Sequence, residues 1–336
     1  MKRDVGRVLF AAENQVLFDA EETDLALDSN GVILETQYSC VSAGTELAKL
    51  TGLQPFDFPA TLGNRAVSRV LEAGPKCKGL KAGDLVFSHT HHVSHTKGGR
   101  LVAKLPESLN RPESALLGMA MVALTGVQTA HPDLGDRAVV IGAGLVGQCA
   151  AQLLELSGVQ VTLIDRVDGR LKVAEECGVS ETVNGEKQDP VAAIMEKTDG
   201  VDCVLECTGV PALVESAPKY AGRSAVVVLV GSPRGEYQTD LTSFLQAFHL
   251  WRPNGNLTLK GSHEWKTAGE STGYTKHSQV RNMGILARMV ESGKLNLNRL
   301  LSRTYAPRDA AQAYHDLKEN KDEVLGAVFD WTQEAD

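Results

Sequence analysis

The chain has 336 residues, of which 43% are hydrophobic and 23% are charged, so we expect a soluble globular protein of about two domains. The net charge of −8 excludes nucleic acid as a main partner, because such a surface repels phosphate backbones. The sequence has neither an apolar run long enough for a membrane span nor a secretory leader, and its six cysteines are scattered. We therefore expect a cytoplasmic protein with free thiols and no membrane partner.

The first 124 residues contain short apolar segments separated by Gly and Pro turns. Examples are VILETQYSC (32–40), AVSRVLEAG (66–74) and DLVFSH (84–89). Short strands at such even spacing predict a small β-barrel or sandwich.

From Arg137 the pattern changes to alternating strands and helices. Helical segments are expected near 145–157, 169–177, 189–198 and 211–220, which predicts an α/β fold with a doubly wound parallel sheet. The expected strands are RAVVIGA (137–143), QVTLID (160–165), VDCVLECT (201–208), SAVVVLVGS (224–232) and NLTLKGS (256–262).

The first of these strands runs into the spacing Gly142-x-Gly144-x-x-Gly147. Gly142 permits a tight turn, Gly144 lets a pyrophosphate approach the backbone, and Gly147 lets the helix lie close to the strand. The phosphates would bind the free amides of the helix N-terminus, which begins with Leu145 and Val146. The alternative is a glycine turn in a domain that binds no nucleotide.

Asp165 ends the second strand, 165 − 142 = 23 residues after the first glycine. That separation fits the carboxylate that binds the adenosine ribose hydroxyls, and it favours NAD over NADP. Arg166 leaves the other reading open, because a guanidinium there could pair with a 2′-phosphate.

After Ser262 come a polar loop (263–277), a helix near 280–291 and a closing strand, LGAVFDW (325–331). The loop carries Trp265 and Tyr274 beside charged residues, which would suit a polyhydroxylated substrate. A mobile surface loop is the alternative. We expect the tail to return to the first domain.

The chain resembles the medium-chain dehydrogenase/reductase superfamily. The resemblance rests on SAGTEL (42–47), Leu62-Gly63, KAGDLV (81–86), VVIGAGLVG with Asp165, and the terminal Val328-Phe329-Asp330-Trp331. It implies a GroES-like catalytic domain (1–124), a Rossmann NAD-binding domain (125–256) and a return to the catalytic domain (257–336), with the cofactor in the cleft between the domains. The terminal motif is similar to that of a zinc-free branch, which bacteriochlorophyllide hydroxyethyl dehydrogenases resemble.

The chain departs from the zinc-dependent members at the metal ligands. Those members carry Cys-Gly-Ser/Thr-Asp where this chain has Ala43-Gly44-Thr45-Glu46, and Gly-His-Glu where it has Gly63-Asn64-Arg65. The third ligand position falls near Gly118-Met119, and the four-cysteine structural zinc lobe is missing. Alanine and glycine have no donor side chain and arginine is a permanent cation, so we expect no metal.

Without zinc, a side chain must polarise the substrate oxygen and accept its proton. Arg65 with Asn64 is the first candidate, although an ion pair between Arg65 and Glu46 would give the arginine a structural role. Thr45 matches the family's relay hydroxyl, or is a turn residue. Three histidines are candidates for proton transfer, or belong to a solvated loop or a metal cluster: His89, His91 and His92.

The resemblance also implies a cofactor wall at the ends of later strands, where Gly and Ser could instead be ordinary turn residues. Its residues are Cys207, Thr208, Gly209, Val230, Gly231, Ser232, Gly261 and Ser262.

The favoured function is NAD-dependent, zinc-independent oxidation of a secondary alcohol on a sugar, cyclitol or similar polar substrate. The alternatives are an NADPH-dependent quinone or enoyl reductase and a dinucleotide-binding protein without turnover. Family members commonly dimerise through an edge strand, here NLTLKGS, so we expect a homodimer.

Overall fold

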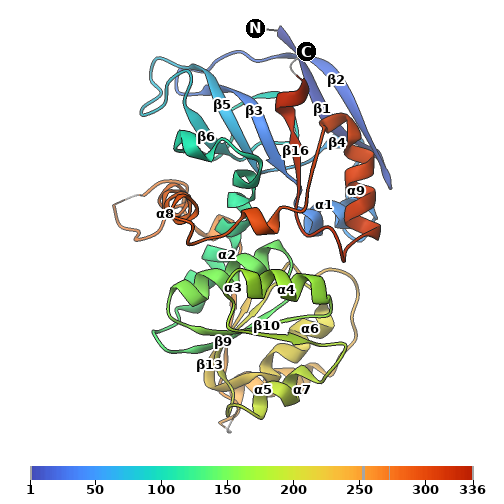
Figure 1. Cartoon of the computed structure of the whole chain (residues 1–336), viewed down its shortest axis with the longest axis vertical. Helices are drawn as coiled ribbons and strands as arrows, with labels where there is room; N and C mark the ends of the chain where they lie inside the picture. The colour runs from blue at the N-terminus through green and yellow to red at the C-terminus, as the bar shows by residue number, and fades with distance from the viewer. Residues whose placement is uncertain (1, 252–253, 272, 335–336) are drawn as a thin grey trace. The chain divides into compact units, whose positions relative to one another are not determined.

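The computed structural model describes residues 2–251, 254–271 and 273–334, and it divides into two compact units (Figure 1). Each unit is described by itself, and the boundary near residue 118 falls within α2 (Leu117–Ala130). Unit 1 comprises Met1–Gly118, Ala268–Gly293 and Leu300–Asp336, and unit 2 comprises Met119–Thr267 and Lys294–Arg299.

Unit 1 contains two sheets. A long hairpin of β1 (Lys2–Ala12) and β2 (Gln15–Asp24) pairs with β4 (Ala60–Thr61) in the smaller sheet. The larger sheet has the order β15-β16-β3-β5-β6-β8, with β7 beside β3, and β16 pairs with β3 across the chain's first and last parts. Its strands are β3 (Val32–Cys40), β5 (Ala66–Ala73), β6 (Leu85–Ser88), β7 (His95–Lys97), β8 (Val102–Lys104), β15 (Arg303–Tyr305) and β16 (Ala327–Asp330).

Aromatic side chains join the segments of unit 1. The rings of Phe10 and Tyr314 meet edge-on at 5.0 Å between centroids, and Tyr314 also packs against Phe329. These side chains are fully buried, and such aromatic pairs stabilise a core beyond the area they bury. The helices are α1 (Ala43–Leu50), α8 (Gln279–Glu291) and α9 (Ala310–Glu319), with short turns η1 (Glu107–Leu109), η2 (Pro112–Leu116), η6 (Pro307–Asp309) and η7 (Trp331–Glu334).

Unit 2 is built on a parallel sheet with the order β11-β10-β9-β12-β13-β14. In Figure 1, α3 and α4 lie on one face of this sheet, and α5, α6 and α7 lie on the other. The expected doubly wound sheet is therefore confirmed, and β14 is at its edge. The elements are β9 (Arg137–Ile141), β10 (Gln160–Asp165), β11 (Glu181–Asn184), β12 (Val201–Glu206), β13 (Ala221–Leu229), β14 (Thr258–Gly261), α3 (Leu145–Leu156), α4 (Asp168–Glu176), α5 (Pro190–Met195), α6 (Pro211–Ser216), η3 (Ala217–Lys219), α7 (Leu241–His249), η4 (Glu264–Lys266) and η5 (Asn298–Leu300).

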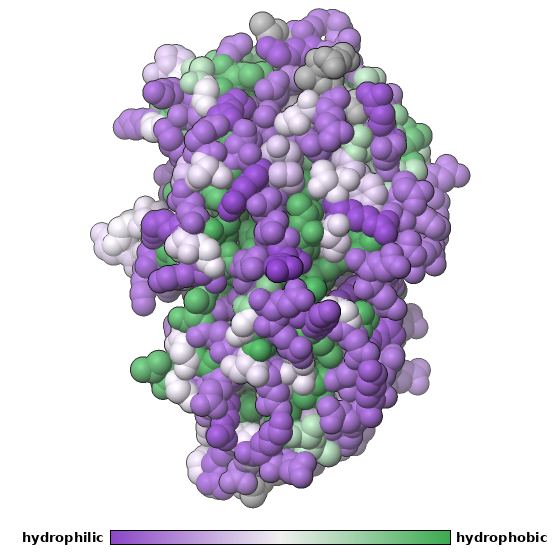
Figure 2. Space-filling view, in the orientation of Figure 1, coloured by the Kyte–Doolittle hydropathy of each residue, from purple (hydrophilic) through white to green (hydrophobic). Residues whose placement is uncertain are grey.

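Hydrophilic residues cover most of the face drawn in Figure 2, with scattered hydrophobic residues between them. Within the described part of the chain, no helix is both long and apolar enough to cross a membrane.

Candidate functional site

The three glycines of the loop between β9 and α3 differ in how much space a side chain would have. Gly142 has a φ of +98°, and a Cβ there would lie 2.5 Å from Cγ2 of Thr208. A Cβ at Gly147 would lie 1.7 Å from the carbonyl oxygen of Gly142, whereas one at Gly144 would meet nothing within 4 Å. The loop is therefore closely packed at its two ends and open at its middle glycine.

The open glycine is also the N-cap of α3. Gly144 has extended backbone and no side chain to cap the first turn, which starts at Leu145 and Val146. The turn therefore presents backbone N–H groups at the positive end of a 12-residue helix. This arrangement suits an anion such as a pyrophosphate.

The variants Gly147→Ala and Gly144→Ala test this difference in the space available to a side chain. We expect Gly147→Ala to lower the free energy of unfolding of unit 2 by about 3 kcal/mol, because its methyl group must displace backbone. Gly144→Ala should leave the stability within about 0.5 kcal/mol of the native protein and weaken dinucleotide binding. Denaturant unfolding checks the first effect, and equal stabilities of the two variants would contradict it.

The Asp165 carboxylate, at the end of β10, accepts three backbone hydrogen bonds. Oδ2 accepts from the N–H of Ala143 at 2.6 Å, and Oδ1 accepts from the N–H groups of Arg166 at 2.8 Å and Val167 at 3.0 Å. Asp165 thus ties the glycine loop to the turn after β10 while its oxygens keep further lone pairs. Arg166 is exposed and extends toward Glu186, with 3.9 Å between Nη1 and Oε1.

The turn after β12 is held by a carboxylate that the sequence pattern did not single out. Glu206 is fully buried and accepts from the N–H groups of Thr208 at 2.7 Å and Gly209 at 3.0 Å. Burial raises its pKa, and these hydrogen bonds offset part of that shift.

The other predicted cofactor-wall residues lie at the same edge of the unit 2 sheet. Gly231 approaches Gly209 so closely that a Cβ on Gly231 would lie 2.3 Å from the Gly209 nitrogen. Ser262 is buried after β14, and its N–H donates to the Leu229 carbonyl at 2.9 Å. Because parallel strands share one carboxyl edge, the glycine loop, Asp165 and this wall lie along one side of the sheet; the wall comprises Cys207, Thr208, Gly209, Val230, Gly231, Ser232, Gly261 and Ser262.

In unit 1, Arg65 fills the space beside Gly118. The side chain is 4% exposed, and its Nη1 donates to Oδ1 of Asn64. A Cβ on Gly118 would lie 2.4 Å from the Arg65 Cδ and 2.9 Å from its Nε. The arginine and the glycine at position 118 are therefore sterically linked, because any larger residue there would displace the guanidinium.

Glu46 and His92 form a hydrogen-bonded pair that is buried and not accessible to solvent. His92 is 0% and Glu46 is 3% exposed, and His92 Nε2 lies 3.2 Å from Glu46 Oε2. The same oxygen accepts from the Tyr314 hydroxyl at 2.5 Å, and Oε1 accepts from the Ser42 N–H at 2.9 Å. On its other side, His92 Nδ1 lies 2.8 Å from Oγ of Ser39, which also accepts from the Trp331 indole at 2.9 Å.

Burial alone would raise the pKa of Glu46, but His92, Tyr314 and Ser42 together hold it below its usual value. Burial and the neighbouring carboxylate raise the pKa of Tyr314 well above its usual range, so its hydroxyl stays a donor. The sequence missed Tyr314 and Ser39, which no local pattern identifies, and it singled out Trp331 only as part of the terminal motif. We call Glu46, His92, Tyr314, Ser39 and Trp331 the buried network.

The three candidate histidines have different surroundings. His92 uses both ring nitrogens in the buried network, and His89 is buried edge-on to the Phe87 ring. His91 is exposed, and its Nδ1 lies 2.8 Å from the Gly63 carbonyl oxygen. A carbonyl only accepts, so Nδ1 carries the hydrogen and Nε2 of the neutral ring keeps its lone pair. His91 is thus the histidine best placed to accept a proton.

Thr45 is half-buried in α1 rather than in a turn. It lies next to Glu46 in the first turn of that helix. Arg65, Asn64, His91, Thr45 and the buried network all belong to unit 1.

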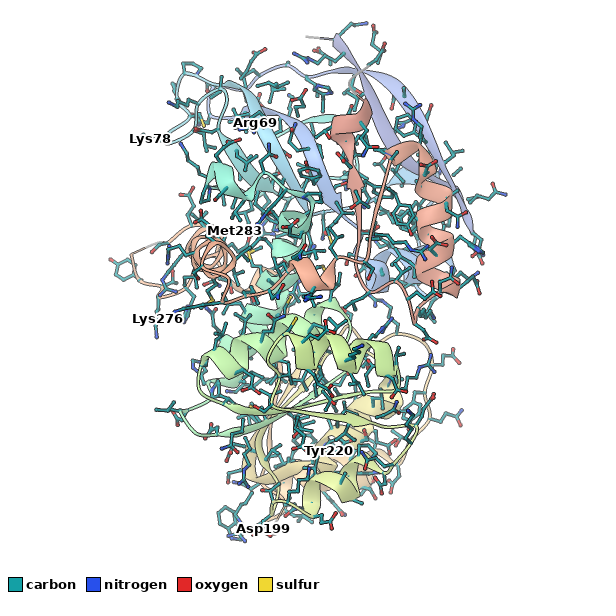
Figure 3. All side chains as sticks on the ribbon, viewed as in Figure 1. Arg69, Lys78, Asp199, Tyr220, Lys276 and Met283 are labelled. Atoms are coloured by element: carbon teal, nitrogen blue, oxygen red, sulfur yellow. The ribbon has the colours of Figure 1, made fainter. Side chains whose placement is uncertain are left out.

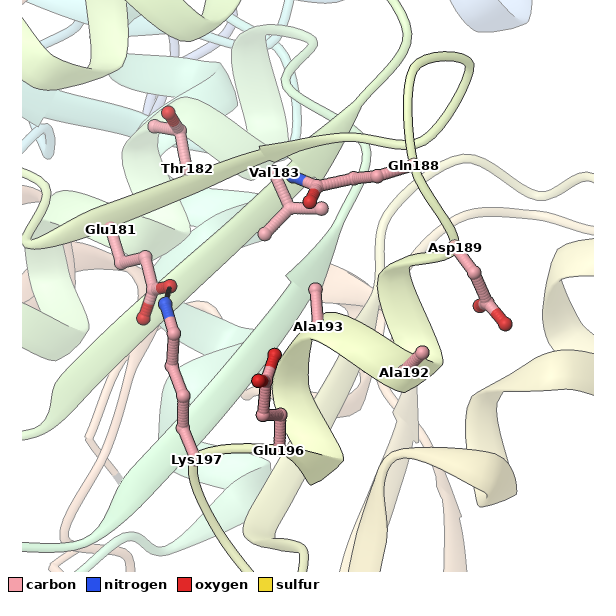
Figure 4. Close-up of a pocket in the computed structure, with 9 residues that line it drawn as sticks. All are labelled: Glu181, Thr182, Val183, Gln188, Asp189, Ala192, Ala193, Glu196 and Lys197. Carbon is pink, nitrogen blue, oxygen red and sulfur yellow. Dashed lines mark hydrogen bonds and ion pairs between the residues drawn. The ribbon is translucent and has the colours of Figure 1, made fainter.

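Unit 2 also has a surface depression (Figure 4). It lies between β11 and α5, at the amino end of β11, where Lys197 pairs with Glu181. It is open to solvent and holds none of the predicted site residues. Its lining residues are Glu181, Thr182, Val183, Gln188, Asp189, Ala192, Ala193, Glu196 and Lys197.

Residues 146–271 match the family model described as zinc-binding dehydrogenase. An uncharacterized zinc-type alcohol dehydrogenase-like protein of Escherichia coli K12, YdjJ, is 24% identical over 71% of this chain and 63% of its own length. D-xylulose reductase of Morganella morganii is 27% identical over 63% of this chain and 57% of its own length. The aligned region therefore spans less than two thirds of these relatives.

Solved structures share the fold over nearly the whole chain. Galactitol-1-phosphate dehydrogenase of Escherichia coli has a TM-score of 0.83 at 19% identity, covering 97% of this chain and 99% of the other. Residues 146–271 are therefore similar to the zinc-binding dehydrogenase family, and nearly the whole chain has the fold of these dehydrogenase structures.

Nicotinamide cofactors are present in two other structures that share this fold. A zinc-binding dehydrogenase of Sinorhizobium meliloti 1021 bound to NADP has a TM-score of 0.79 at 18% identity, with 97% and 99% of the chains covered. An alcohol dehydrogenase of E. coli CFT073 in complex with NADH has a TM-score of 0.77 at 15% identity, with the same coverage.

The name of the matched family implies zinc, but the residues of this chain do not fit the metal at the usual position. Ala43 and Gly118 offer no donor atom, and Arg65 brings a positive charge that packs against Gly118. Among the described residues, no group of three or more His, Cys, Asp or Glu side chains is arranged to hold a metal ion.

Proposed function

We propose that this protein is an NAD-dependent dehydrogenase that oxidises a secondary alcohol on a sugar, cyclitol or similar polar substrate without catalytic zinc. The observation that carries this proposal is the packing of Arg65 against Gly118. A cation there, with no room for a ligand side chain at position 118, supports a side-chain mechanism in place of the metal.

The proposed cofactor site is the carboxyl edge of the unit 2 sheet. Gly144 and the first turn of α3 would bind the pyrophosphate, and Asp165 would accept hydrogen bonds from the adenosine ribose. The wall at the ends of β12, β13 and β14 would contact the nicotinamide half. The nicotinamide, when bound, accepts the hydride from the alcohol carbon.

In unit 1, Arg65 would stabilise the negative charge that develops on the substrate oxygen, with Asn64 fixing the guanidinium. His91 would accept the hydroxyl proton at Nε2, because the Gly63 carbonyl holds the hydrogen on Nδ1. Thr45 is the candidate for relaying that proton. Glu46 and His92 would not contact the substrate and would instead hold the surrounding side chains in position through the buried network.

The proposed substrate class is supported by the names of two similar proteins and by the residues of the loop 263–277. D-xylulose reductase and galactitol-1-phosphate dehydrogenase are named for polyols or sugars. The loop 263–277 carries Trp265 and an exposed Tyr274, whose rings could stack on a sugar face. We also propose a cytoplasmic homodimer formed through the edge strand β14.

The function is tested by incubating the purified protein with NAD and a panel of polyols while the absorbance of the reduced cofactor is followed. Turnover of alcohols with NAD supports the proposal. Activity only with NADPH and enones would replace it with a quinone or enoyl reductase, and NAD binding without any turnover would replace it with a non-catalytic nucleotide-binding protein.

Replacing Asp165 with alanine should weaken NAD binding by about 1–3 kcal/mol, because a charged hydrogen-bond acceptor is lost. Asp199→Ala is the control, since Asp199 is an exposed residue at the amino end of β12 (Figure 3). Fluorescence titration with NADH checks both variants. Equal affinity of Asp165→Ala and the native protein would remove Asp165 from the ribose site.

A further inference from the structure

The turn after β10, the start of α4 and the loop after β11 meet at the end of β10. The register pairs Asp165 with Asn184, so the residues after β10 and β11 leave the sheet side by side. The buried Asn184 amide donates to the Arg166 carbonyl at 3.1 Å and to Asp168 Oδ1 at 2.7 Å, and its Oδ1 accepts from the Glu186 N–H at 2.9 Å. The Asn184 side chain therefore fixes the backbone that carries Arg166 and Glu186.

Arg166 follows one acidic residue in the chain, and its side chain pairs with another acidic residue in the loop after β11. Asp165 precedes it in the chain, and Glu186 lies 3.9 Å from its Nη1 across the gap between the strands. Both side chains of the Arg166–Glu186 pair are about two thirds exposed, 69% and 66%, so the pair adds little to stability. The pair instead affects the local electrostatics, because the Glu186 carboxylate neutralises the Arg166 guanidinium, which could otherwise bind a ligand phosphate.

Two more charges at this edge cancel each other. Lys187 Nζ lies 2.5 Å from Asp168 Oδ2, which makes a neutral pair. The local group then holds three carboxylates, those of Asp165, Asp168 and Glu186, against the two cations Arg166 and Lys187, a net charge of −1. A ribose 2′-phosphate would meet this negative field, whereas a ribose with free hydroxyls would not be repelled.

We propose that Glu186 is a cofactor-specificity residue, which rejects a 2′-phosphorylated dinucleotide by holding Arg166 and keeping the adenosine end of the site negative. This inference rests on the proposed function and extends it to a residue outside the glycine motif and the Asp165 strand. Glu186 acts on selectivity rather than on NAD affinity, because a nucleotide without the phosphate gains nothing from its removal.

The test is fluorescence titration of the native protein and two variants with NADH and with NADPH. Glu186→Gln should bind NADPH about three- to tenfold more tightly, because one repulsive charge is lost and Arg166 is released. Its affinity for NADH should change less than about twofold. Glu196→Gln is the matched control, since Glu196 is an exposed glutamate that follows α5 at the opposite end of the sheet. It should alter neither affinity.

Salt provides a second readout. The gain of Glu186→Gln should shrink in concentrated sodium chloride, because exposed charges are screened. An unchanged ratio of NADPH to NADH affinity in Glu186→Gln, or the same change in Glu196→Gln, would overturn the inference while leaving the proposed function in place. Failure of the native protein to bind either nucleotide would overturn the proposed function and this inference together.

Discussion

Replacing Arg65 with alanine lowers the turnover of the alcohol substrate by roughly 10²–10³-fold, the loss typical of removing one preorganised donor to a developing oxyanion. The NAD affinity should stay within about twofold, because the proposed nucleotide contacts all belong to unit 2. The measurement is steady-state kinetics together with NADH titration. A fall in turnover at unchanged nucleotide affinity separates a chemical role from a loss of folding.

Two further variants sharpen this prediction. Gly118→Ala retains the arginine but places a methyl group 2.4 Å from its Cδ, so it should displace the guanidinium and also lower turnover. Arg69→Ala is the control, because Arg69 lies four residues further along the chain and pairs with Glu107 at the surface (Figure 3). Native turnover in both Arg65→Ala and Gly118→Ala would remove Arg65 from the active site.

Replacing Glu46 with alanine should lower the free energy of unfolding by about 3–5 kcal/mol, because a buried carboxylate with three hydrogen-bond partners is removed. The variant leaves His92, the Tyr314 hydroxyl and the Ser42 N–H without their shared acceptor in a dry interior. Urea unfolding checks the value. Glu319→Ala, an exposed glutamate at the end of α9, should change the stability by no more than about 0.5 kcal/mol.

The same carboxylate predicts a pH dependence of stability. The pKa of Glu46 in the folded protein lies below its usual value of 4.5, so its contribution is complete above that pH and is lost as the pH falls below it. The native protein should therefore lose stability on acidification more steeply than Glu46→Ala. Parallel pH profiles for the two proteins, or a loss of less than about 1 kcal/mol in the variant at neutral pH, would contradict the assignment.

The parallel sheet of unit 2 could be predicted from sequence because each of its long strands is a continuous apolar run beside a helix. VDCVLE is buried on both faces apart from Asp202, and Ala225, Val227 and Val228 of SAVVVL are buried too. The strand β11 and the helix α7 were not predicted. β11 is the four-residue ETVN at the sheet edge, and α7 exposes Leu241 and Leu245, so neither follows a simple pattern of burial.

The candidate groups of unit 1 were found only in part, for a different reason. Asn64 and Arg65 stand where zinc-dependent members carry His and Glu, so the replacement can be recognised from the sequence. Tyr314 contacts Glu46 across 268 residues, and it lies in a helix where an aromatic residue is ordinary core. The sequence also suggested an Arg65–Glu46 pair, whereas the structure surrounds the Glu46 carboxylate with His92, Tyr314 and Ser42. Such long-range partners follow from the fold and not from spacing.

The most direct test combines metal analysis with turnover on a single preparation of the native protein. The zinc content is measured by mass spectrometry, and NADH formation from the best polyol is followed before and after dialysis against a chelator. The account predicts far less than one zinc per chain and the same rate of NADH formation after dialysis. Stoichiometric zinc, with activity that is lost on chelation and restored by adding the metal, would contradict it.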